Sequence, residues 1–369
     1  MIQVLMIGRA TLFSHPGGDT MQITKTAEYL NKTNKVLVDI KTVENEIDYS
    51  KYNLIHLFNI CRPADLLGTI KKANKPYIVS TIFVDFSEAE KNHYKFHRRF
   101  FFRLLKNDKL EYLKASIRIL KGQDKLTDNS YLFKGQKKSI IEIIKGAELL
   151  LPNSKSEYNR LFKTYKVAQD YRVIPNAIDL DIFSSEKSKD EKFNKFDDSI
   201  VSVGQITPVK NQLLIIQALN NIKQDVFIIG SPASNSLAYY NECKKIAAKN
   251  IHFISHLSQA ELAEIFKRAK VHVLASWFET TGLVSLEAAY SGCNIVISNR
   301  GDQMEYFKDD VFYCEPSQIS SITKAVDSAY ISAFNVNLKN RIETDYNWEK
   351  AAQETLKAYC FVLDKLKEG

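Results

Sequence analysis

Short apolar runs alternate with amphipathic helical stretches along almost the whole chain. In the first half, strand-like runs end in polar or glycine-containing turns, and they cover residues 3–7, 36–40, 54–58, 76–82, 147–151 and 171–174. Helical spacing of apolar positions separates them, as in the stretch 21–31. An alternation of strands and helices predicts an α/β fold built on parallel sheets.

The second half repeats this alternation after a polar interruption. Residues 184–198 are charged and polar and are interpreted as a linker. Strand-like runs follow at 199–204, 226–230, 251–254, 271–275 and 294–298. A length of 369 residues suits two domains. We therefore expect an N-terminal domain over 1–180, a second domain over 181–345 and a final amphipathic helix over 346–369.

The stretch 271–298 organises the second half. An apolar run, 271–275, precedes a polar turn, and a helical pattern begins at Gly282 and stops near Gly292. The next strand-like run completes a β-α-β unit. Its turn lies at the carboxyl end of a parallel strand, where open α/β sheets bind ligands.

Two carboxylates flank the start of this helix. Glu279 lies in the turn and Glu287 lies eight residues later. The amides near Gly282, Leu283 and Val284 are the unpaired donors of a helix start, which favour an anion, and carboxylates accept hydroxyl hydrogen bonds from polyols. Two ordinary acids on a solvated helix are the competing interpretation, but the strand-turn-helix-strand context favours a site.

At this point the residues resemble a known family. The segment 278–288, Phe-Glu-Thr-Thr-Gly-Leu-Val-Ser-Leu-Glu-Ala, resembles the E-x7-E signature of retaining glycosyltransferases of the GT-B fold, family 4. The segment 301–305 is similar to the family's G-G-x-x-E. The resemblance implies two Rossmann-like domains facing across a cleft, with the C-terminal helix crossing back to the N-terminal domain. It also implies that Glu279 contacts the donor sugar and that Glu287 holds the nucleotide ribose.

Other segments extend the resemblance. Residues 204–211 are similar to the family's G-R-x-x-x-x-K-G loop, which implies that Lys210 neutralises the donor diphosphate beside Gly204. Gln205 stands where the family has Arg, so that one phosphate-binding charge is missing. Thr281, in the turn before the helix, joins the expected donor-binding residues. The segment 175–179 resembles the P-N-G-V-D that ends the family's N-terminal domain.

Three weaker candidates come from positions after predicted strands. Gly17 and Gly18 resemble the family's N-terminal glycine loop, which faces the donor, while neighbouring Asp19 is an alternative helix cap. His256 stands where the family places the nucleotide base, although a surface histidine is the plainer interpretation. Asp85 follows the strand after which the family often has a His, and it is either a catalytic group or an ordinary loop acid.

The composition is that of a globular protein, with 45% hydrophobic and 25% charged residues. No apolar run reaches the length of about 18 residues that a membrane-spanning helix needs. The apolar start, 1–8, lacks a basic region and is interpreted as a strand, not a signal peptide. Five scattered cysteines predict reduced thiols. We expect a cytoplasmic protein.

The segment 87–138 breaks the alternation and predicts a helical insertion. Its part 91–138 holds fourteen Lys or Arg and four Asp or Glu, so its net charge of +10 exceeds the +8 of the whole chain. Interleaved aromatic residues favour peripheral binding to an anionic membrane surface, the inner face, with a lipid-linked or otherwise anionic acceptor. A solvated insertion is the alternative. Nucleic-acid binding is disfavoured because no recognised motif accompanies the charge.

The expected function is transfer of a sugar from a nucleotide-sugar donor, most simply a UDP-sugar, to a glycan or lipid-linked acceptor. The resemblance implies retention of the anomeric configuration, synthesis of cell-surface polysaccharide or glycoconjugate, and no cofactor or metal ion. The alternatives are a GT-B nucleotide-sugar epimerase, a phosphorylase, and a catalytically inactive GT-B subunit that binds a partner or glycan.

Overall fold

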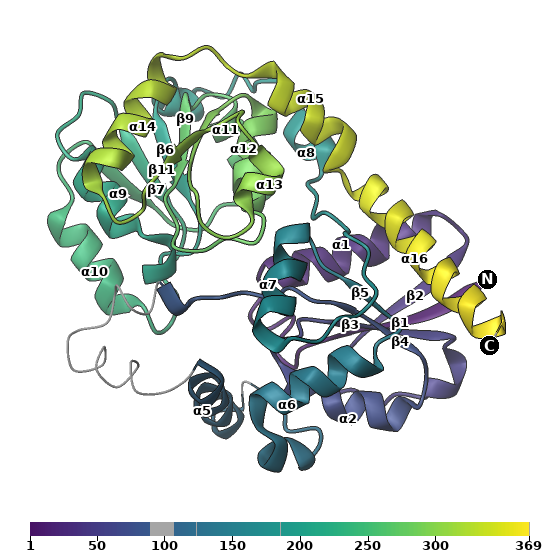
Figure 1. The fold of residues 1–369 in the computed structure, drawn as a ribbon. Helices are drawn as coiled ribbons and strands as arrows, with labels where there is room; N and C mark the ends of the chain where they lie inside the picture. Colours follow the sequence, from purple (N-terminus) through teal and green to yellow (C-terminus); the bar gives the residue numbers. More distant parts are fainter. Residues whose placement is uncertain (89–106, 123, 185, 369) are drawn as a thin grey trace. The chain divides into compact units, whose positions relative to one another are not determined.

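A computed structural model describes residues 1–88, 107–122, 124–184 and 186–368. The chain forms two compact units, which are described separately. Unit 1 comprises the described residues of Met1–Val84, Tyr94–Ala177 and Trp348–Gly369, and unit 2 those of Asp85–His93 and Ile178–Asn347. The strands and helices of both units are labelled in Figure 1.

Unit 1 is built on a parallel sheet in the order β2-β1-β3-β4-β5. The strands are β1 (Ile2–Gly8), β2 (Val36–Thr42), β3 (Leu54–Phe58), β4 (Tyr77–Ser80) and β5 (Leu149–Leu151). In the register, Val4 of the central β1 lies opposite Val38 and Leu54. The sequence prediction of these strands is confirmed, since each apolar run contains one.

The side chains of β1 alternate between two cores. Val4 and Met6 pack on α1 (Gly18–Lys32) and α16 (Trp348–Glu368), whereas Leu5 and Ile7 point to the face covered by α2 (Pro63–Ala73), α6 (Ser130–Gly146) and α7 (Lys155–Tyr165). Figure 1 shows α16 lying beside α1. Helix α5 (Asn107–Leu120) packs on α6. Burial on both faces explains why the strands are continuous apolar runs.

A buried histidine fastens α16 to the sheet. His56 of β3 is 1% exposed, its Nδ1 lies 2.8 Å from the Tyr359 hydroxyl of α16, and its Nε2 lies 2.8 Å from Ser80 Oγ of β4. Burial lowers the pKa of His56 to about 3, so the imidazole is neutral. The last helix of the chain is therefore part of unit 1.

Unit 2 has a second parallel sheet, in the order β11-β10-β9-β6-β7-β8. Its strands are β6 (Ile200–Val203), β7 (Val226–Ile229), β8 (Ile251–Ile254), β9 (Val271–Leu274), β10 (Asn294–Ser298) and β11 (Phe312–Cys314). One face packs on α9 (Gln212–Leu219), α10 (Leu237–Ile246) and α14 (Ile319–Ile331). The other packs on α8 (Leu180–Ser184), α11 (Gln259–Phe266), α12 (Leu283–Ser291), α13 (Gln303–Phe307) and α15 (Val336–Asp345).

Two sequence predictions are wrong. The expected strand at 171–174 makes only a single bridge, between Leu150 and Tyr171, at the edge of the sheet. The expected linker at 184–198 contains a short 3-10 helix, Glu191–Phe196, whose Phe193 and Phe196 are buried in unit 2. The high charge of this stretch predicted exposure, although two of its aromatic side chains are buried. Their burial in the core makes the stretch part of the domain.

The predicted helix stop at Gly292 is confirmed, and other helix ends also follow local signals. Ser154 caps α7 by accepting a hydrogen bond from the Glu157 amide at 2.9 Å, and Ser258 and Glu261 form a reciprocal capping box at the start of α11. Gly292 ends α12 with φ of 110°. The five cysteines are free thiols. The helix caps and the glycine stop depend on neighbouring residues alone, which is why they can be recognised in the sequence.

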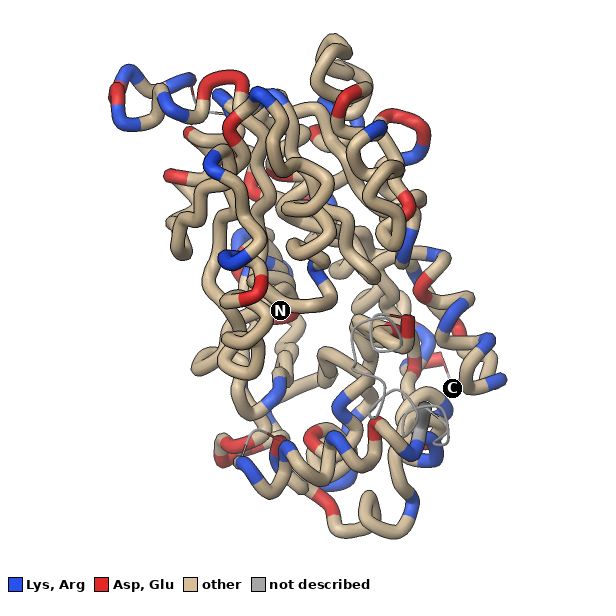
Figure 2. Tube along the Cα trace, turned by 90° about the vertical axis from the view of Figure 1, so that its left-hand side faces the viewer, with Lys and Arg blue, Asp and Glu red and all other residues tan. Residues whose placement is uncertain are grey.

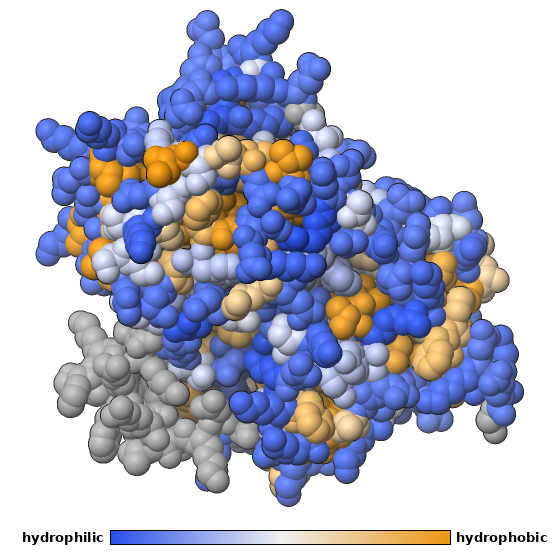
Figure 3. Space-filling model, turned by 45° about the horizontal axis from the view of Figure 1, so that its top comes forward, coloured by the Kyte–Doolittle hydropathy of each residue, from blue (hydrophilic) through white to orange (hydrophobic). Residues whose placement is uncertain are grey.

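The surface is polar and of mixed charge. Lys and Arg alternate with Asp and Glu along the tube of Figure 2, and the face drawn in Figure 3 is mostly hydrophilic with separate small apolar groups. Of the helices within the described ranges, none combines the length and the apolar character required to cross a bilayer. Part of the basic insertion, including Lys91, Lys95, Arg98, Arg99, Arg103 and Lys106, lies outside the described residues.

Candidate functional site

The candidate site lies at the point of unit 2 where the strand order reverses. The chain runs outward from β6 to β7 and β8, then returns to the other side of β6 with β9. Loops that leave the carboxyl ends of strands on either side of such a reversal diverge, and the crevice between them is where α/β sheets bind ligands. The loop after β6 contains Lys210, and the loop after β9 contains Glu279.

Hydrogen bonds to backbone carbonyls hold these two loops together. The Trp277 amide donates to the Val209 carbonyl at 2.8 Å, and Asn211 Nδ2 donates to the Ala275 carbonyl at 3.0 Å. Lys210 Nζ consequently lies 2.5 Å from Glu279 Oε1, with the side chains 25% and 11% exposed. The two residues predicted to act on the donor are brought together as an ion pair that still reaches solvent.

Gly301 fixes the backbone on which Glu279 sits. Its φ is 73°, and a Cβ at this position would lie 1.9 Å from the Glu279 carbonyl oxygen. The adjacent Asp302 amide donates to that same oxygen at 2.9 Å. The G-G-x-x-E-like segment therefore supports Glu279 from behind, and only a glycine permits this approach.

The start of α12 provides free donors. Gly282 has φ of 73° and precedes the helix, so that the chain turns sharply from the Glu279 loop into α12. The amides of Leu283 and Val284 have no acceptor within the described part of the chain. Free amides at the positive end of a helix are a suitable site for phosphate oxygens.

Glu287 lies further along α12 and is half-buried. Among the described residues its carboxylate has neither a hydrogen-bond partner nor an ion-pair partner. Burial raises its pKa to about 7. Surrounding protein thus disfavours the charge, and a ligand that donates hydroxyl hydrogen bonds would compensate for the missing partners.

The remaining predicted residues of unit 2 are Gly204, Gln205, His256 and Thr281. Gly204 (φ 152°) lies at the end of β6, and a Cβ there would be 3.8 Å from Lys210 Cε. Gln205, which replaces the family Arg, has an exposed side chain, and His256 is exposed in the loop after β8. Thr281 is buried, 1% exposed, and its hydroxyl has no partner among the described residues.

A buried polar group beneath α12 was missed by sequence analysis. His272 of β9 lies 3.2 Å from the Ser285 hydroxyl through Nε2, and burial lowers its pKa to about 3. Gln303 is fully buried, and its amide has no partner in the described ranges. A Cβ on Gly282 would lie 2.8 Å from Gln303 Nε2. A lone Gln in a polar segment gives no sequence signal of burial.

The glycine loop lies in unit 1. Gly17 caps α1 and Gly18 is its first residue, both exposed, and a Cβ on Gly18 would meet nothing within 4 Å. The fold itself therefore does not require a glycine at 18. The alternative role of Asp19 as the helix cap is wrong, because Gly17 occupies that position and Asp19 pairs with Arg9.

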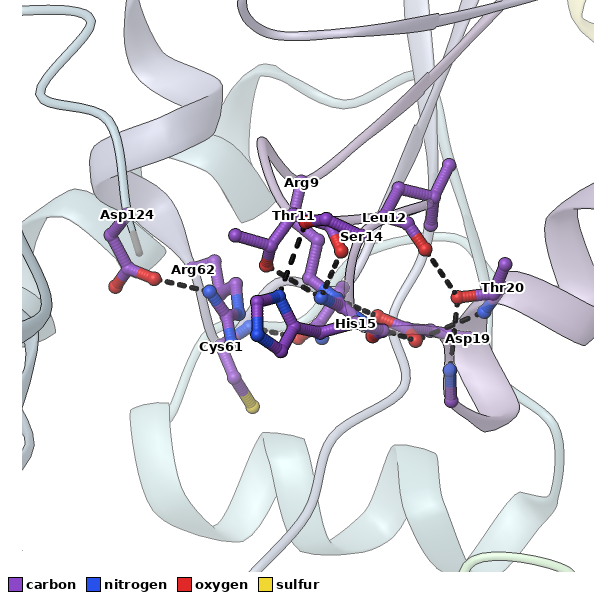
Figure 4. Close-up of polar contacts among 12 residues, drawn as sticks. Arg9, Thr11, Leu12, Ser14, His15, Asp19, Thr20, Cys61, Arg62 and Asp124 are labelled. Carbon is purple, nitrogen blue, oxygen red and sulfur yellow. Dashed lines mark hydrogen bonds and ion pairs between the residues drawn. The ribbon is translucent and has the colours of Figure 1, made fainter. Parts of the chain in front are cut away.

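Arg9, which sequence analysis missed, holds this loop in place. Figure 4 shows its guanidinium donating to Asp19 and to the loop around it. The bonds are 2.7 Å to Asp19 Oδ2, 2.8 Å to the Thr11 carbonyl and 2.7 Å to the His15 carbonyl. Burial raises the pKa of Asp19, but the Arg9 bonds and charge outweigh this and leave it below its ordinary value.

Asp85 is separate from the Lys210–Glu279 pair. It is exposed, and its Oδ1 accepts from the Ser87 amide at 3.0 Å. Its segment is held on unit 2, where the Phe86 ring packs edge-on against Phe278 at 5.9 Å. Arg300 anchors the same segment with two bonds to Glu88 of 3.0 and 2.9 Å. The contacts of Asp85 within the described residues do not include Lys210 or Glu279.

Two parallel-sheet units and a switch-point site define a GT-B protein. Solved structures agree over nearly the whole chain. Sucrose-phosphate synthase from Thermosynechococcus elongatus matches with a TM-score of 0.75 at 16% identity, covering 99% of this chain and 100% of that one. Anabaena HepE, solved in complex with UDP-glucose, matches with a TM-score of 0.67 at 13% identity, covering 97% and 100%.

Sequence comparison finds a family similarity over part of the chain. Residues 183–354 match the family described as Glycosyl transferases group 1. An uncharacterized glycosyltransferase of Methanocaldococcus jannaschii is 26% identical over 233 residues, which cover 58% of this chain and 60% of that protein. The match thus spans about three fifths of that relative. Residues 183–354 thus resemble the group 1 glycosyltransferases, and the chain has the GT-B fold.

Proposed function

We propose that the protein transfers a sugar from a nucleotide-sugar donor, most simply a UDP-sugar, to a glycan or lipid-linked acceptor with retention of anomeric configuration. The observation that carries the proposal is the set of polar and charged groups on and beside α12. One charged pair, two free amides and one unpartnered carboxylate together complement a sugar, a diphosphate and a ribose. The E-x7-E resemblance supports the same division of roles.

Unit 2 would hold the donor. Lys210 and the Leu283 and Val284 amides stabilise the negative charge that develops on the diphosphate as the anomeric C–O bond breaks. Glu279 orients the donor sugar, and Glu287 accepts hydrogen bonds from the ribose. The new bond forms to the acceptor oxygen, whose proton is released, and the nucleoside diphosphate leaves. These cationic and dipolar groups supply the leaving-group stabilisation without a metal ion or a cofactor.

Unit 1 would take the acceptor, and we further propose that it rests on an anionic membrane surface. Large apolar side chains on α5 and α6 are exposed: Leu113, Ile117, Leu120, Leu132 and Phe133. Phe133, at 90% exposed, has three lysines close by in the chain, Lys134, Lys137 and Lys138. Apolar tips beside basic residues suit the headgroup region of an anionic bilayer. The role would be cytoplasmic synthesis of surface glycans.

A donor panel tests this function. UDP-, GDP-, dTDP- and ADP-sugars are compared by thermal shift, because a ligand that binds the folded state raises its melting temperature. The donor that stabilises the protein is then incubated with glycan and lipid-linked acceptors, and nucleotide release and glycosylated product are both measured. Binding together with transfer supports the proposal. Binding with epimerised sugar and no transfer indicates the epimerase, and binding without any turnover indicates an inactive subunit.

A further inference from the structure

Unit 1 has a strand reversal of its own. In the order β2-β1-β3-β4-β5 the chain changes direction between β1 and β3, so the loops after these two strands lie at the kind of position where α/β sheets bind ligands. The loop after β1 contains Arg9, and the loop after β3 contains Arg62. Neither the sequence prediction nor the proposed donor site uses Arg62.

Two arginines, Arg62 and Arg118, clamp the buried carboxylate of Asp124 beside these loops. The Asp124 side chain is 1% exposed. Arg62 Nη1 pairs with its Oδ1, and Arg118 Nε of helix α5 donates to its Oδ2 at 2.7 Å. Figure 4 shows Arg62 lying between Asp124 and the group formed by Arg9 and Asp19. The positive charge of Arg62 reaches that group, since it contributes to the low pKa of Asp19.

The clamp is rigidly supported by the start of α2. Thr127 Oγ1 donates to the Ala64 carbonyl at 2.8 Å, and the Gly68 amide donates to Thr127 Oγ1 at 3.0 Å. A Cβ on Gly68 would lie 2.3 Å from the Thr127 carbonyl oxygen, so only glycine lets the 124–128 segment lie on this helix. Asp124 is therefore fixed without a ligand, and the two guanidiniums are oriented in advance.

Arg62 and Arg118 use only a few of their N–H donors to bind Asp124. A guanidinium has five N–H groups, and in the described structure Arg62 and Arg118 each engage Asp124 through one nitrogen. Their side chains are 22% and 25% exposed. Arg9 differs, since it is 8% exposed and bonded on every nitrogen. The outward donors of Arg62 and Arg118 thus remain available to a ligand.

Cations outnumber carboxylates at this corner. Lys121 and Lys125 are exposed and flank Asp124 in the chain. The second carboxylate, Asp65, is fully buried and its Oδ1 accepts from the Lys125 amide at 2.8 Å. Burial raises the pKa of Asp65 to about 6. The net charge of these groups is positive. Its accessible part includes the guanidinium groups of Arg62 and Arg118, whose planar arrangement of N–H donors can bind two oxygens of an oxyanion at once.

We propose that Arg62 and Arg118 bind a phosphate group carried by the acceptor. The inference rests on the proposed function, because it assumes that unit 1 receives the acceptor. Two guanidiniums held on one carboxylate present several donors to one point. The three terminal oxygens of a phosphate monoester, or the four non-bridging oxygens of a diphosphate linkage, use these donors more fully than the two oxygens of a carboxylate. The acceptor is accordingly a phosphorylated sugar or a phosphate-linked lipid glycan.

Calorimetric titration with inorganic phosphate at constant ionic strength tests the site. Wild type binds phosphate, and Arg118→Gln and Arg62→Gln each weaken the affinity by about tenfold or more, as expected for one charged hydrogen bond. Lys72→Gln removes one exposed charge at the other end of α2 and keeps wild-type affinity. Asp124→Asn retains or tightens binding, because the amide oxygen still accepts from the guanidiniums while the competing negative charge is removed. Phosphate bound beside Lys210 is insensitive to Arg118, so only the Arg118-dependent component counts.

Three results overturn the proposal: no Arg118-dependent phosphate binding, equal loss in Lys72→Gln, or equal affinity for acetate. Melting temperatures establish that each variant is folded. UDP binding measured in the same samples is expected to be unchanged in Arg118→Gln. Glucose 6-phosphate and vesicles containing a phosphate-linked lipid then identify the source of the phosphate. If wild type binds no nucleotide sugar, the proposed function fails while the phosphate result still stands or falls by itself.

Discussion

Lys210 Nζ and Glu279 Oε1 lie 2.5 Å apart. The pair joins the loop after β6 to the loop after β9, and it neutralises a cation that the proposed reaction assigns to the diphosphate. A bound donor would place a negative diphosphate and a neutral sugar against the two partners. Contacts from Lys210 to the diphosphate and from Glu279 to the sugar would then replace the contact between the two side chains.

Replacing each partner should separate these roles. Glu279→Ala is expected to reduce turnover strongly while leaving UDP affinity unchanged or higher, because Lys210 loses its competing carboxylate. Lys210→Ala should lower both. Calorimetry with UDP and steady-state kinetics with the nucleotide sugar measure the two effects. Full transfer activity in Glu279→Ala would show that the E-x7-E assignment is wrong.

Glu287→Gln should weaken nucleotide binding without unfolding the protein. A carboxylate that accepts ribose hydroxyls contributes about 1.5–3 kcal/mol through charged hydrogen bonds. Calorimetry with UDP and with uracil provides the comparison, since uracil has no ribose and should lose no affinity. Equal UDP affinity of variant and wild type would remove the ribose role.

The same substitution should change how stability depends on pH. The pKa of Glu287 is raised to about 7 in the folded protein, above the ordinary value of about 4.3. Between these values the folded state binds more protons, so Glu287 lowers stability as pH rises, and its full cost is present above pH 7. Glu287→Gln should therefore be more stable than wild type at pH 8 by up to about 3 kcal/mol, and the gain should vanish near pH 4. Urea unfolding at both pH values measures it.

Gly301→Ala should damage both the fold of unit 2 and the position of Glu279. The added Cβ would lie 1.9 Å from the Glu279 carbonyl oxygen, and φ is 73°. Gly292→Ala is the matched control, because it also has positive φ but its Cβ meets nothing within 4 Å. We expect the control to lose about 1 kcal/mol in urea unfolding and to keep its activity. Gly301→Ala should lose more stability and most of its turnover. Equal losses in the two variants would contradict the proposed support.

Membrane association should depend on the exposed face of α6. Co-sedimentation with anionic vesicles at low salt is expected for wild type, and it should fall at high salt. Lys137→Glu with Lys138→Glu should weaken it by about 1 kcal/mol per charge removed, and Phe133→Ser should weaken it at every salt concentration. Lys244→Glu with Lys245→Glu in unit 2 is the charge-matched control. If wild type ignores anionic vesicles at low salt, the membrane proposal fails.

The sequence by itself determined the α/β class, the position of most strands and the motif loops. Strands buried on both faces are continuous apolar runs, and caps such as Ser258 with Glu261 depend on a few neighbouring residues, so each leaves a local signal. The Glu279, Gly282 and Glu287 spacing is local for the same reason. Local patterns failed where burial depended on distant partners, as for Phe193 and Phe196 in the expected linker.

Only the tertiary structure decided which of the marked residues meet. The contact between Lys210 and Glu279 spans 69 positions, and that between Arg62 and Asp124 spans 62. Sheet order creates the first contact, because parallel strands far apart in the chain end at one edge and deliver their loops together. Packing of the 124–128 segment on α2 creates the second. Asp124 is an ordinary residue in the sequence, and only the tertiary structure places it between Arg62 and Arg118. The sequence shows which residue types are present, and the order of the strands together with the packing of the helices determines which of them meet.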